Sequence, residues 1–208
     1  MAGFSIVMLW MIVIYLIVAV ICVLWGIASY VMTSLSVYTI AKRRNITKPW
    51  LAWVPVANVW TLGSLSDQYR YVTQGKITNK RKVLLGLYIA VIALLLVMLI
   101  PYASMIMLAI SSVDSVMTDA QIMQMMTQAL IVLAVAFAVM AVAIVYAVFL
   151  YIALYDVFRS CDPKNATLYL VLTILLGVVY PFFMLACRKK DLGMPERKNV
   201  DSAAEPLG

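Results

Sequence analysis

The feature that most constrains this chain is the length of its uncharged stretches. Residues 1–41 contain no Asp, Glu, Lys or Arg, and residues 83–156 contain no Lys or Arg. About 20 apolar residues are enough for a helix to cross the roughly 30 Å hydrocarbon core of a bilayer. Apolar residues make up 65 % of the chain and charged residues 12 %, whereas soluble domains average about 45–50 % and about 25 %. We therefore expect an integral membrane protein.

Three apolar stretches are long enough to cross a membrane as helices, namely 4–40, 83–103 and 121–158. Two others contain prolines and are expected to be broken or re-entrant, namely 49–63 and 164–187. The fold class is thus all-α, a polytopic integral membrane helical bundle with three to four transmembrane helices and one or two re-entrant or interfacial segments. Residues 1–190 are expected to form a single transmembrane domain, and residues 191–208 a polar cytosolic tail.

Two helix starts can be placed from side chains that cap orphan backbone N–H groups. Thr118 and Gln121 have the spacing of a capping box, which predicts a helix that begins there. The stretch 104–128 around this capping box, apart from the helix that begins there, is expected to be a loop. Asp162 followed by Pro163 predicts a second start, with Asp as N-cap and Pro at the first helical position.

The 16 basic residues lie in three clusters, which bear on the threading through the membrane. They occupy 42–82, 159–164 and 188–198. If 164–187 crosses the membrane, the last cluster is on the opposite face from the others. If that stretch turns back at Gly177 to Pro181, all clusters stay cytosolic, as the positive-inside rule requires. We favour the second course, with three full spans, the N-terminus outside and the C-terminus cytosolic.

The broken segment 49–63 is rich in tryptophan, a residue that favours the membrane interface. On a helical wheel three tryptophans fall on one side, which predicts interfacial anchors at Trp50, Trp53 and Trp60. Pro55 is expected to kink the segment. The basic clusters are expected to contact anionic lipid headgroups.

A faint internal repeat links the two broken segments. Residues 38–42 read YTIAK and residues 155–159 read YDVFR. Each copy ends a long apolar helix and is followed by a short polar link and a broken apolar segment. This pattern favours two parallel halves joined by the span 83–103, as in some small transporters or scaffolds.

Two stretches resemble sequences of small bacterial membrane proteins. Residues 50–58 read WLAWVPVAN and resemble the W-x-x-[IV]-P-x-x-N segment that recurs in several uncharacterised families. The tail at 188–195 reads RKKDLGMP and resembles the ending of one such family from Gram-positive anaerobes. The resemblance implies a multi-pass protein of the bacterial plasma membrane, and it implies no activity or cofactor.

Several chemistries are excluded or disfavoured by missing residues. The chain has no His and no C-x-x-C pattern, so ordinary zinc sites and His-based catalysis are excluded. Nucleic-acid binding is not expected of so apolar a chain. Methionines between 105 and 126, near Asp114 and Asp119, could capture Cu(I), but packing explains the same pattern. We therefore expect no metal, no cofactor and no enzymatic activity.

Two residues are candidates for binding, Asn58 in the tryptophan-rich segment and Asp156 at the end of a span. Asp67 with Arg70, and Asp156 with Arg159, have the i, i+3 spacing of helix-stabilising ion pairs. For function, we expect an accessory or scaffold protein that acts through a protein partner or as a homo-oligomer. One alternative is a small channel or facilitator with a path between the broken segments, around Asn58 and Gly177. A second is a membrane-embedded lipid-modifying enzyme.

Overall fold

The computed structural model describes residues 2–111 and 118–191. Every element in this part of the chain is a helix, which confirms the all-α prediction. The elements are α1 (Ala2–Arg43), η1 (Pro49–Trp53), α2 (Pro55–Gln74), α3 (Lys80–Ser111), α4 (Asp119–Cys161), α5 (Ala166–Leu175), η2 (Gly177–Val179) and α6 (Tyr180–Lys190).

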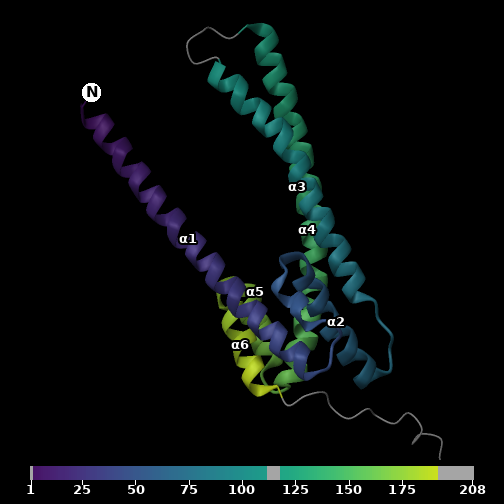
Figure 1. Cartoon of the computed structure of the whole chain (residues 1–208). Coiled ribbons are helices and arrows are strands. Elements are labelled where there is room, and N and C mark those ends of the chain that lie inside the picture. Colours follow the sequence, from purple (N-terminus) through teal and green to yellow (C-terminus); the bar gives the residue numbers. More distant parts are fainter. Residues whose placement is uncertain (1, 112–117, 192–208) are drawn as a thin grey trace, which may run out of the picture.

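Three helices, α1, α3 and α4, are long and apolar enough to cross a membrane, so the chain is a multi-pass membrane protein. α3 and α4 run antiparallel side by side, whereas α1 diverges from them over its N-terminal half (Figure 1). The capping box at the start of α4 is confirmed, because Thr118 Oγ1 accepts a hydrogen bond from Gln121 N and Gln121 Oε1 accepts one from Thr118 N.

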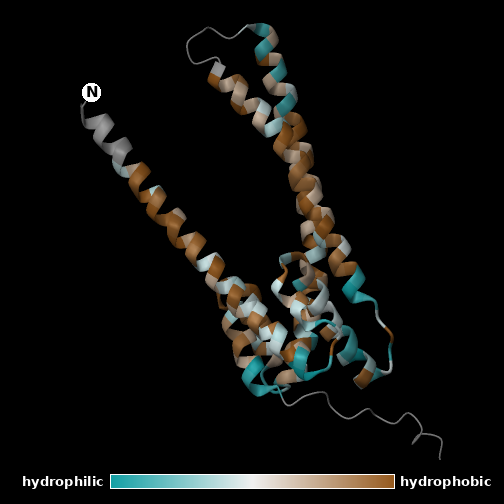
Figure 2. Ribbon diagram, viewed as in Figure 1, coloured by the Kyte–Doolittle hydropathy of each residue, from teal (hydrophilic) through white to brown (hydrophobic). Residues whose placement is uncertain are grey.

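The chain is compact only at one end, where α2, α5 and α6 surround the C-terminal ends of α1 and α4. The core here includes fully buried side chains from four of these helices, Ile40, Leu65, Val157, Phe158 and Met184. Hydrophilic residues gather at this same end, and the apolar shafts extend away from it (Figure 2). We call it the basic end, since it carries the basic clusters at 42–82, 159–164 and 188–190.

Each broken segment folds back on itself. The first rises as η1, turns at Val54 and returns as α2. The second rises as α5, turns through η2 and returns as α6, so that Lys190 Nζ lies 2.6 Å from Asp162 Oδ2. A segment that crossed the bilayer could not bring its two ends together in this way. Residues 166–190 are therefore a helical hairpin with both ends at the basic end.

The two halves of the chain are arranged alike. α1 packs against η1 of its own half and against α6 of the other, while α4 packs against α5 of its own half and against α2 of the other. α3 connects the halves. Parallel halves derived from one ancestral unit would have this arrangement, and the duplication itself stays a prediction.

Two differences from the expected helix geometry lie at prolines. Pro55 does not kink a helix, because it occupies the first turn of α2, where its missing N–H has no helical partner to lose. Pro101 lies inside α3, which continues to Ser111, so most of the stretch 104–128 is helical and the predicted loop is too long. The carbonyl of Pro101 accepts a hydrogen bond from Ser104 Oγ.

Two polar stretches also differ from expectation. The first broken segment is expected from the sequence to end at residue 63, but α2 continues as far as Gln74, because apolar and small side chains beyond 63, such as Leu65 and Ser66, are buried in the bundle. Asp162 is the C-cap of α4, and Asn165 is the N-cap of α5, so the predicted Asp162 cap is wrong. Pro163 lies in the turn between these two helices.

The methionines at the far end of the α3–α4 hairpin do not pack into this chain's core. Met107, Met123 and Met126 are each more than 60 % exposed. Met117 and Asp114 lie outside the described residues, as does the predicted polar tail from 192 onward.

Candidate functional site

A cavity of about 340 Å³ lies where the two broken segments turn. Both predicted path residues line it, since Asn58 belongs to the first turn of α2 and Gly177 to η2. We call it the central cavity, and all six α-helices contribute to it. Its lining residues are Tyr30, Thr33, Pro55, Asn58, Val59, Leu62, Tyr88, Tyr146, Leu150, Tyr151, Leu154, Thr173, Gly177 and Tyr180.

The lining of the central cavity is uncharged and mostly apolar in area, with hydroxyl and amide groups set into it. Five of its residues are tyrosines, two are threonines and one is an asparagine, and none of them is acidic or basic. The rings of Tyr88 and Tyr146 lie 5.7 Å apart, centroid to centroid. A second hollow of about 330 Å³ shares Tyr30, Thr33, Gly177 and Tyr180 with it. Hydroxyl and amide groups are therefore the chemistry that this cavity offers.

The central cavity lies well away from the basic end. Tyr30 precedes Lys42 by 12 residues of α1, and Tyr88 follows Lys80 by eight residues of α3. At 1.5 Å per residue these separations correspond to about 18 and about 12 Å. If the basic end marks one membrane surface, the cavity is near the middle of a hydrocarbon core about 30 Å thick.

Asn58 also holds the first broken segment in place. Its Nδ2 donates to Ser34 Oγ on α1 at 3.1 Å and to the carbonyl of Ala52 in η1 at 3.0 Å. Tyr30 adds a second link, because its hydroxyl donates to the carbonyl of Trp53. Asn58 thus joins η1, α2 and α1 at the wall of the cavity.

Asp156 lies below the central cavity, at the basic end, and is only 5 % exposed. It is the centre of a buried polar cluster. One carboxylate oxygen, Oδ2, accepts hydrogen bonds from Lys80 Nζ at 2.8 Å, from Arg70 Nε at 2.8 Å and from Ser66 Oγ. The cluster ties α4 to α2 and to the start of α3.

Both predicted i, i+3 ion pairs are wrong, because the acidic side chains turn toward neighbouring helices. Arg70 pairs with Asp156, whereas Arg159 is exposed. Asp67 instead accepts hydrogen bonds from Thr78 Oγ1 at 2.6 Å and from the backbone N of Lys80 and Arg81 at 3.0 and 3.2 Å. It therefore satisfies two of the N–H groups left open at the start of α3.

A second buried ion pair connects the ends of α1 and α6. Arg44 Nη2 lies 2.7 Å from Asp191 Oδ1, and both side chains are fully buried. The same nitrogen is 3.5 Å from Cys161 Sγ at the end of α4. Like the Asp156 cluster, this pair joins a long helix of one half to a returning helix of the other.

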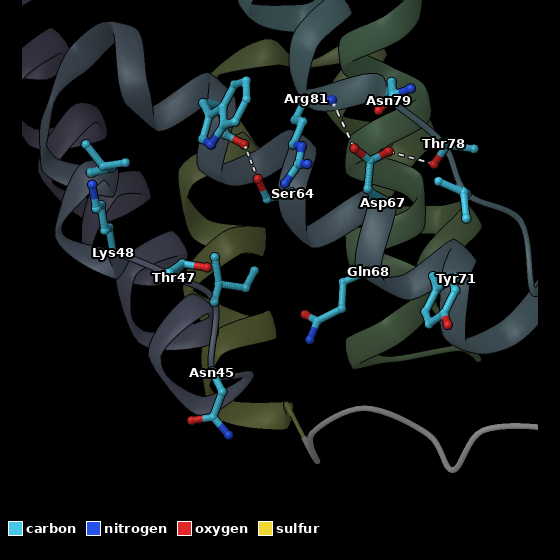
Figure 3. A pocket seen from close by; sticks show the side chains of 14 residues that line it. Asn45, Thr47, Lys48, Ser64, Asp67, Gln68, Tyr71, Thr78, Asn79 and Arg81 are labelled. Atoms are coloured by element: carbon cyan, nitrogen blue, oxygen red, sulfur yellow. Dashed lines mark hydrogen bonds between the residues drawn. The ribbon is translucent and has the colours of Figure 1, made fainter.

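A larger hollow, about 800 Å³, is at the basic end and was not predicted from the sequence. We call it the basic pocket. It lies between the link that follows α1, the α2 helix and the start of α3 (Figure 3). It is lined by Asn45, Ile46, Thr47, Lys48, Leu51, Trp60, Ser64, Asp67, Gln68, Tyr71, Ile77, Thr78, Asn79 and Arg81.

Backbone geometry places Lys48 in the basic pocket. Asn45 and Lys48 both have positive φ, 52° and 61°, although neither is glycine. Such left-handed residues are uncommon outside turns, and they fold residues 45–48 of the link into the pocket wall. On the opposite wall, the Arg81 guanidinium carbon lies 5.2 Å from the centroid of the Trp60 ring. A sequence pattern shows neither feature.

The three tryptophans do not form one helical face. Trp50 and Trp53 belong to η1 and are 57 % and 42 % exposed, whereas Trp60 belongs to α2 and lines the basic pocket. The break at Val54 separates them, so the helical-wheel argument does not apply. An interfacial position of Trp50 and Trp53 stays a prediction.

At the mouth of the second hairpin, Asp162 accepts hydrogen bonds from Lys190 Nζ at 2.6 Å and from Asn165 Nδ2 at 3.0 Å. These bonds lower the pKa of the Asp162 carboxyl from 3.8 to about 2. The bond to Asp162 also raises the pKa of Lys190. The pair thus stabilises the fold above about pH 4, and this contribution is lost as the pH falls toward 2. Because Lys190 titrates only above its ordinary value of 10.5, the pair is constant from about pH 5 to 9.

We expect Asp162→Asn to loosen the last turn of α6. Because solvent screens this ion pair, the effect should be modest, and modification of the buried Cys187 by a thiol reagent should speed up by about two- to fivefold. The increase should be the same at pH 6 and pH 8. Asp119→Asn, at the exposed first turn of α4, is the control. Equal rates of Cys187 modification in the two variants would contradict the conclusion that the Asp162–Lys190 ion pair holds the end of α6 in place.

No protein-family model, curated protein or solved structure matches this chain. The resemblance of residues 50–58 and 188–195 to uncharacterised bacterial families therefore stays a prediction, and the function is argued from the site alone.

Proposed function

We propose that the chain is a facilitator of the bacterial plasma membrane, with its N-terminus outside and its C-terminus in the cytosol. In this proposal a small uncharged polar molecule binds in the central cavity and passes between the two broken segments. The observation that carries the proposal is that Asn58 and Gly177, from the two halves, line one uncharged cavity that contains hydroxyl and amide groups.

The position of the cavity supports this function. Transporters often bind their substrate near the bilayer midplane, between repeats and where helices are interrupted. Hydroxyl and amide groups in hydrocarbon need hydrogen-bond partners. Tyr30, Asn58 and Thr173 already donate hydrogen bonds within the protein, and a polar solute or water can bond to the acceptor oxygens and hydroxyls that remain. The absence of acidic and basic residues from the described lining argues against ion-coupled transport, which normally uses intramembrane charges.

Toward the basic end the cavity has a closed floor. Leu62 and Leu154 line it and are only 3 % and 2 % exposed. Asp156, with its buried ion pairs, follows Leu154 by two residues on α4. In this proposal, passage of a solute to the cytosol requires this floor to open.

Gly177→Phe tests the path with little risk to the fold. A Cβ at Gly177 would meet nothing within 4 Å, so a large side chain can be attached at this lining position without a clash at its first atom, and it should narrow the cavity. We expect purified protein in liposomes to speed glycerol entry, measured by stopped-flow light scattering, and Gly177→Phe to return the rate to that of protein-free vesicles. Asn58→Leu is less informative, because it also removes the bonds that hold η1.

Gly26→Phe is the matched control, since a Cβ at Gly26 on the exposed face of α1 also meets nothing within 4 Å. It should leave the glycerol rate unchanged. A wild-type rate equal to that of empty vesicles, or a Gly177→Phe rate equal to wild type, would contradict the facilitator function.

A second function, that of an accessory protein acting through a partner or a second copy, is favoured by the N-terminal half of α1. No residue in the most apolar stretch of this helix is buried, and Trp10 and Tyr15 are 63 % and 74 % exposed. A photoreactive residue at position 15 that yields one cross-linked protein of fixed mass in native membranes would support this function. Lipid adducts alone would count against it.

A further inference from the structure

The basic pocket continues into an apolar groove on the side of the molecule. This groove, about 400 Å³ in volume, is lined by Leu51, Val54, Val56, Ala57, Trp60, Leu85 and Ile89. It shares Leu51 and Trp60 with the basic pocket. Val54 and Ile89 are 39 % and 49 % exposed, so the groove is open to the surroundings of the protein. The basic pocket, which contains two cations, and the apolar groove thus meet at Trp60.

The direction of the groove matches that of a lipid in the membrane leaflet at the basic end. α3 begins at Lys80 and leads away from the basic end, and Ile89 lies nine residues further on. This separation corresponds to about 13 Å along the helix. A molecule with its head in the basic pocket would therefore lay its chain along α3, toward the middle of the bilayer.

We propose that the basic pocket and the apolar groove together bind one phospholipid with an anionic headgroup. Lys48 and Arg81, on opposite walls of the pocket (Figure 3), attract the anionic headgroup, and the side chains of Thr47 and Asn79 offer further donors. An acyl chain lies in the groove against Leu85 and Ile89. The site is independent of the central cavity, so its failure would leave the facilitator function untouched.

The two cations are available to an anionic ligand. Neither Lys48 nor Arg81 forms an ion pair with another described residue. The Trp60 ring holds the Arg81 guanidinium at the junction of the pocket and the groove, where a headgroup meets its chains. A guanidinium in this position can form two parallel hydrogen bonds with a phosphate.

Asp67 is the acidic residue of the pocket, and its charge is already engaged. Its Oδ1 accepts hydrogen bonds from Thr78 Oγ1 and from Lys80 N, and its Oδ2 accepts one from Arg81 N. These bonds orient the carboxylate toward the start of α3. They also fix the backbone from which the Arg81 side chain extends, so Asp67 positions a cation of the site.

The test is native mass spectrometry of the full chain in detergent, with dioleoyl phosphatidylglycerol or dioleoyl phosphatidylcholine as the probe. We expect a bound phosphatidylglycerol in preference to phosphatidylcholine. At about 1 kcal/mol per cation, Lys48→Gln or Arg81→Gln should weaken phosphatidylglycerol binding about fivefold, and the double variant up to about thirtyfold. Ile89→Gln should weaken both lipids alike.

The matched control is the double variant Lys164→Gln with Lys189→Gln. Both lysines are exposed at the same end of the molecule, outside the pocket, and removing them changes the net charge by the same amount. If this control weakens phosphatidylglycerol binding as much as Lys48→Gln with Arg81→Gln, the attraction is diffuse and the site is overturned. Glycerol 3-phosphate, a soluble headgroup without chains, should not displace the lipid, and displacement at equal concentration would also overturn it.

Discussion

Replacing Asp156 by Asn is expected to lower the free energy of unfolding by about 3–5 kcal/mol, the usual result of removing one partner from a buried ion pair. The amide leaves the ammonium of Lys80, whose side chain is 9 % exposed, without its anion. It also leaves Arg70 Nε and Ser66 Oγ with a neutral and weaker acceptor in place of the carboxylate. Unfolding by SDS in mixed micelles, followed by circular dichroism, measures the change.

Arg159→Gln is the control for Asp156→Asn, since Arg159 is the partner that the i, i+3 spacing predicts and the structure leaves exposed. It should change the free energy of unfolding by no more than about 0.5 kcal/mol, as most surface substitutions do. Lys80→Met combined with Asp156→Leu should recover part of the loss, because it removes both charges together. Equal effects of Asp156→Asn and Arg159→Gln would mean that the buried cluster does not stabilise the fold.

The Asp156 cluster also shows where prediction from the sequence ends. The apolar stretches and the capping box identified the long helices, because hydrophobicity and capping are local properties of the chain. The partners of Asp156 are 76 and 86 residues away, at Lys80 and Arg70. A spacing rule compares only neighbours on one helix, so it paired Asp156 with the wrong arginine.

The candidate sites were predictable to different degrees. The sequence alone predicts a path that joins Asn58 and Gly177, because each interrupts an apolar segment, and in the structure both line one cavity. The tyrosines that form most of its polar lining were missed, since tyrosine in an apolar helix reads as ordinary packing. The basic pocket was missed because it depends on the left-handed backbone of Asn45 and Lys48 and on the packing of α2 against α3.

The packing of α2 against α3 depends on one small residue, Gly63. Its replacement is expected to have the second large effect on stability. A Cβ added at Gly63 on α2 would lie 2.5 Å from Arg81 Cα and 2.9 Å from Arg81 N on α3. Both atoms belong to the backbone, so they cannot move aside as the end of a side chain would. Gly63→Ala must therefore separate the two helices, at a cost of about 1–3 kcal/mol in the free energy of unfolding, typical of overpacking.

Gly86→Ala separates this effect from helix propensity. Gly86 lies on the exposed side of α3, and a Cβ there would meet nothing within 4 Å. Alanine is the better helix former by about 1 kcal/mol, so Gly86→Ala should leave stability unchanged or raise it. The same propensity gain is available at Gly63, so a loss of stability at Gly63 alone isolates the clash. The backbone of Arg81 meets the added Cβ, and its side chain supplies a cation of the basic pocket. Gly63→Ala should therefore also weaken phosphatidylglycerol binding without any change of charge. Unchanged stability and binding in Gly63→Ala would show that α2 and α3 are not closely packed at this point.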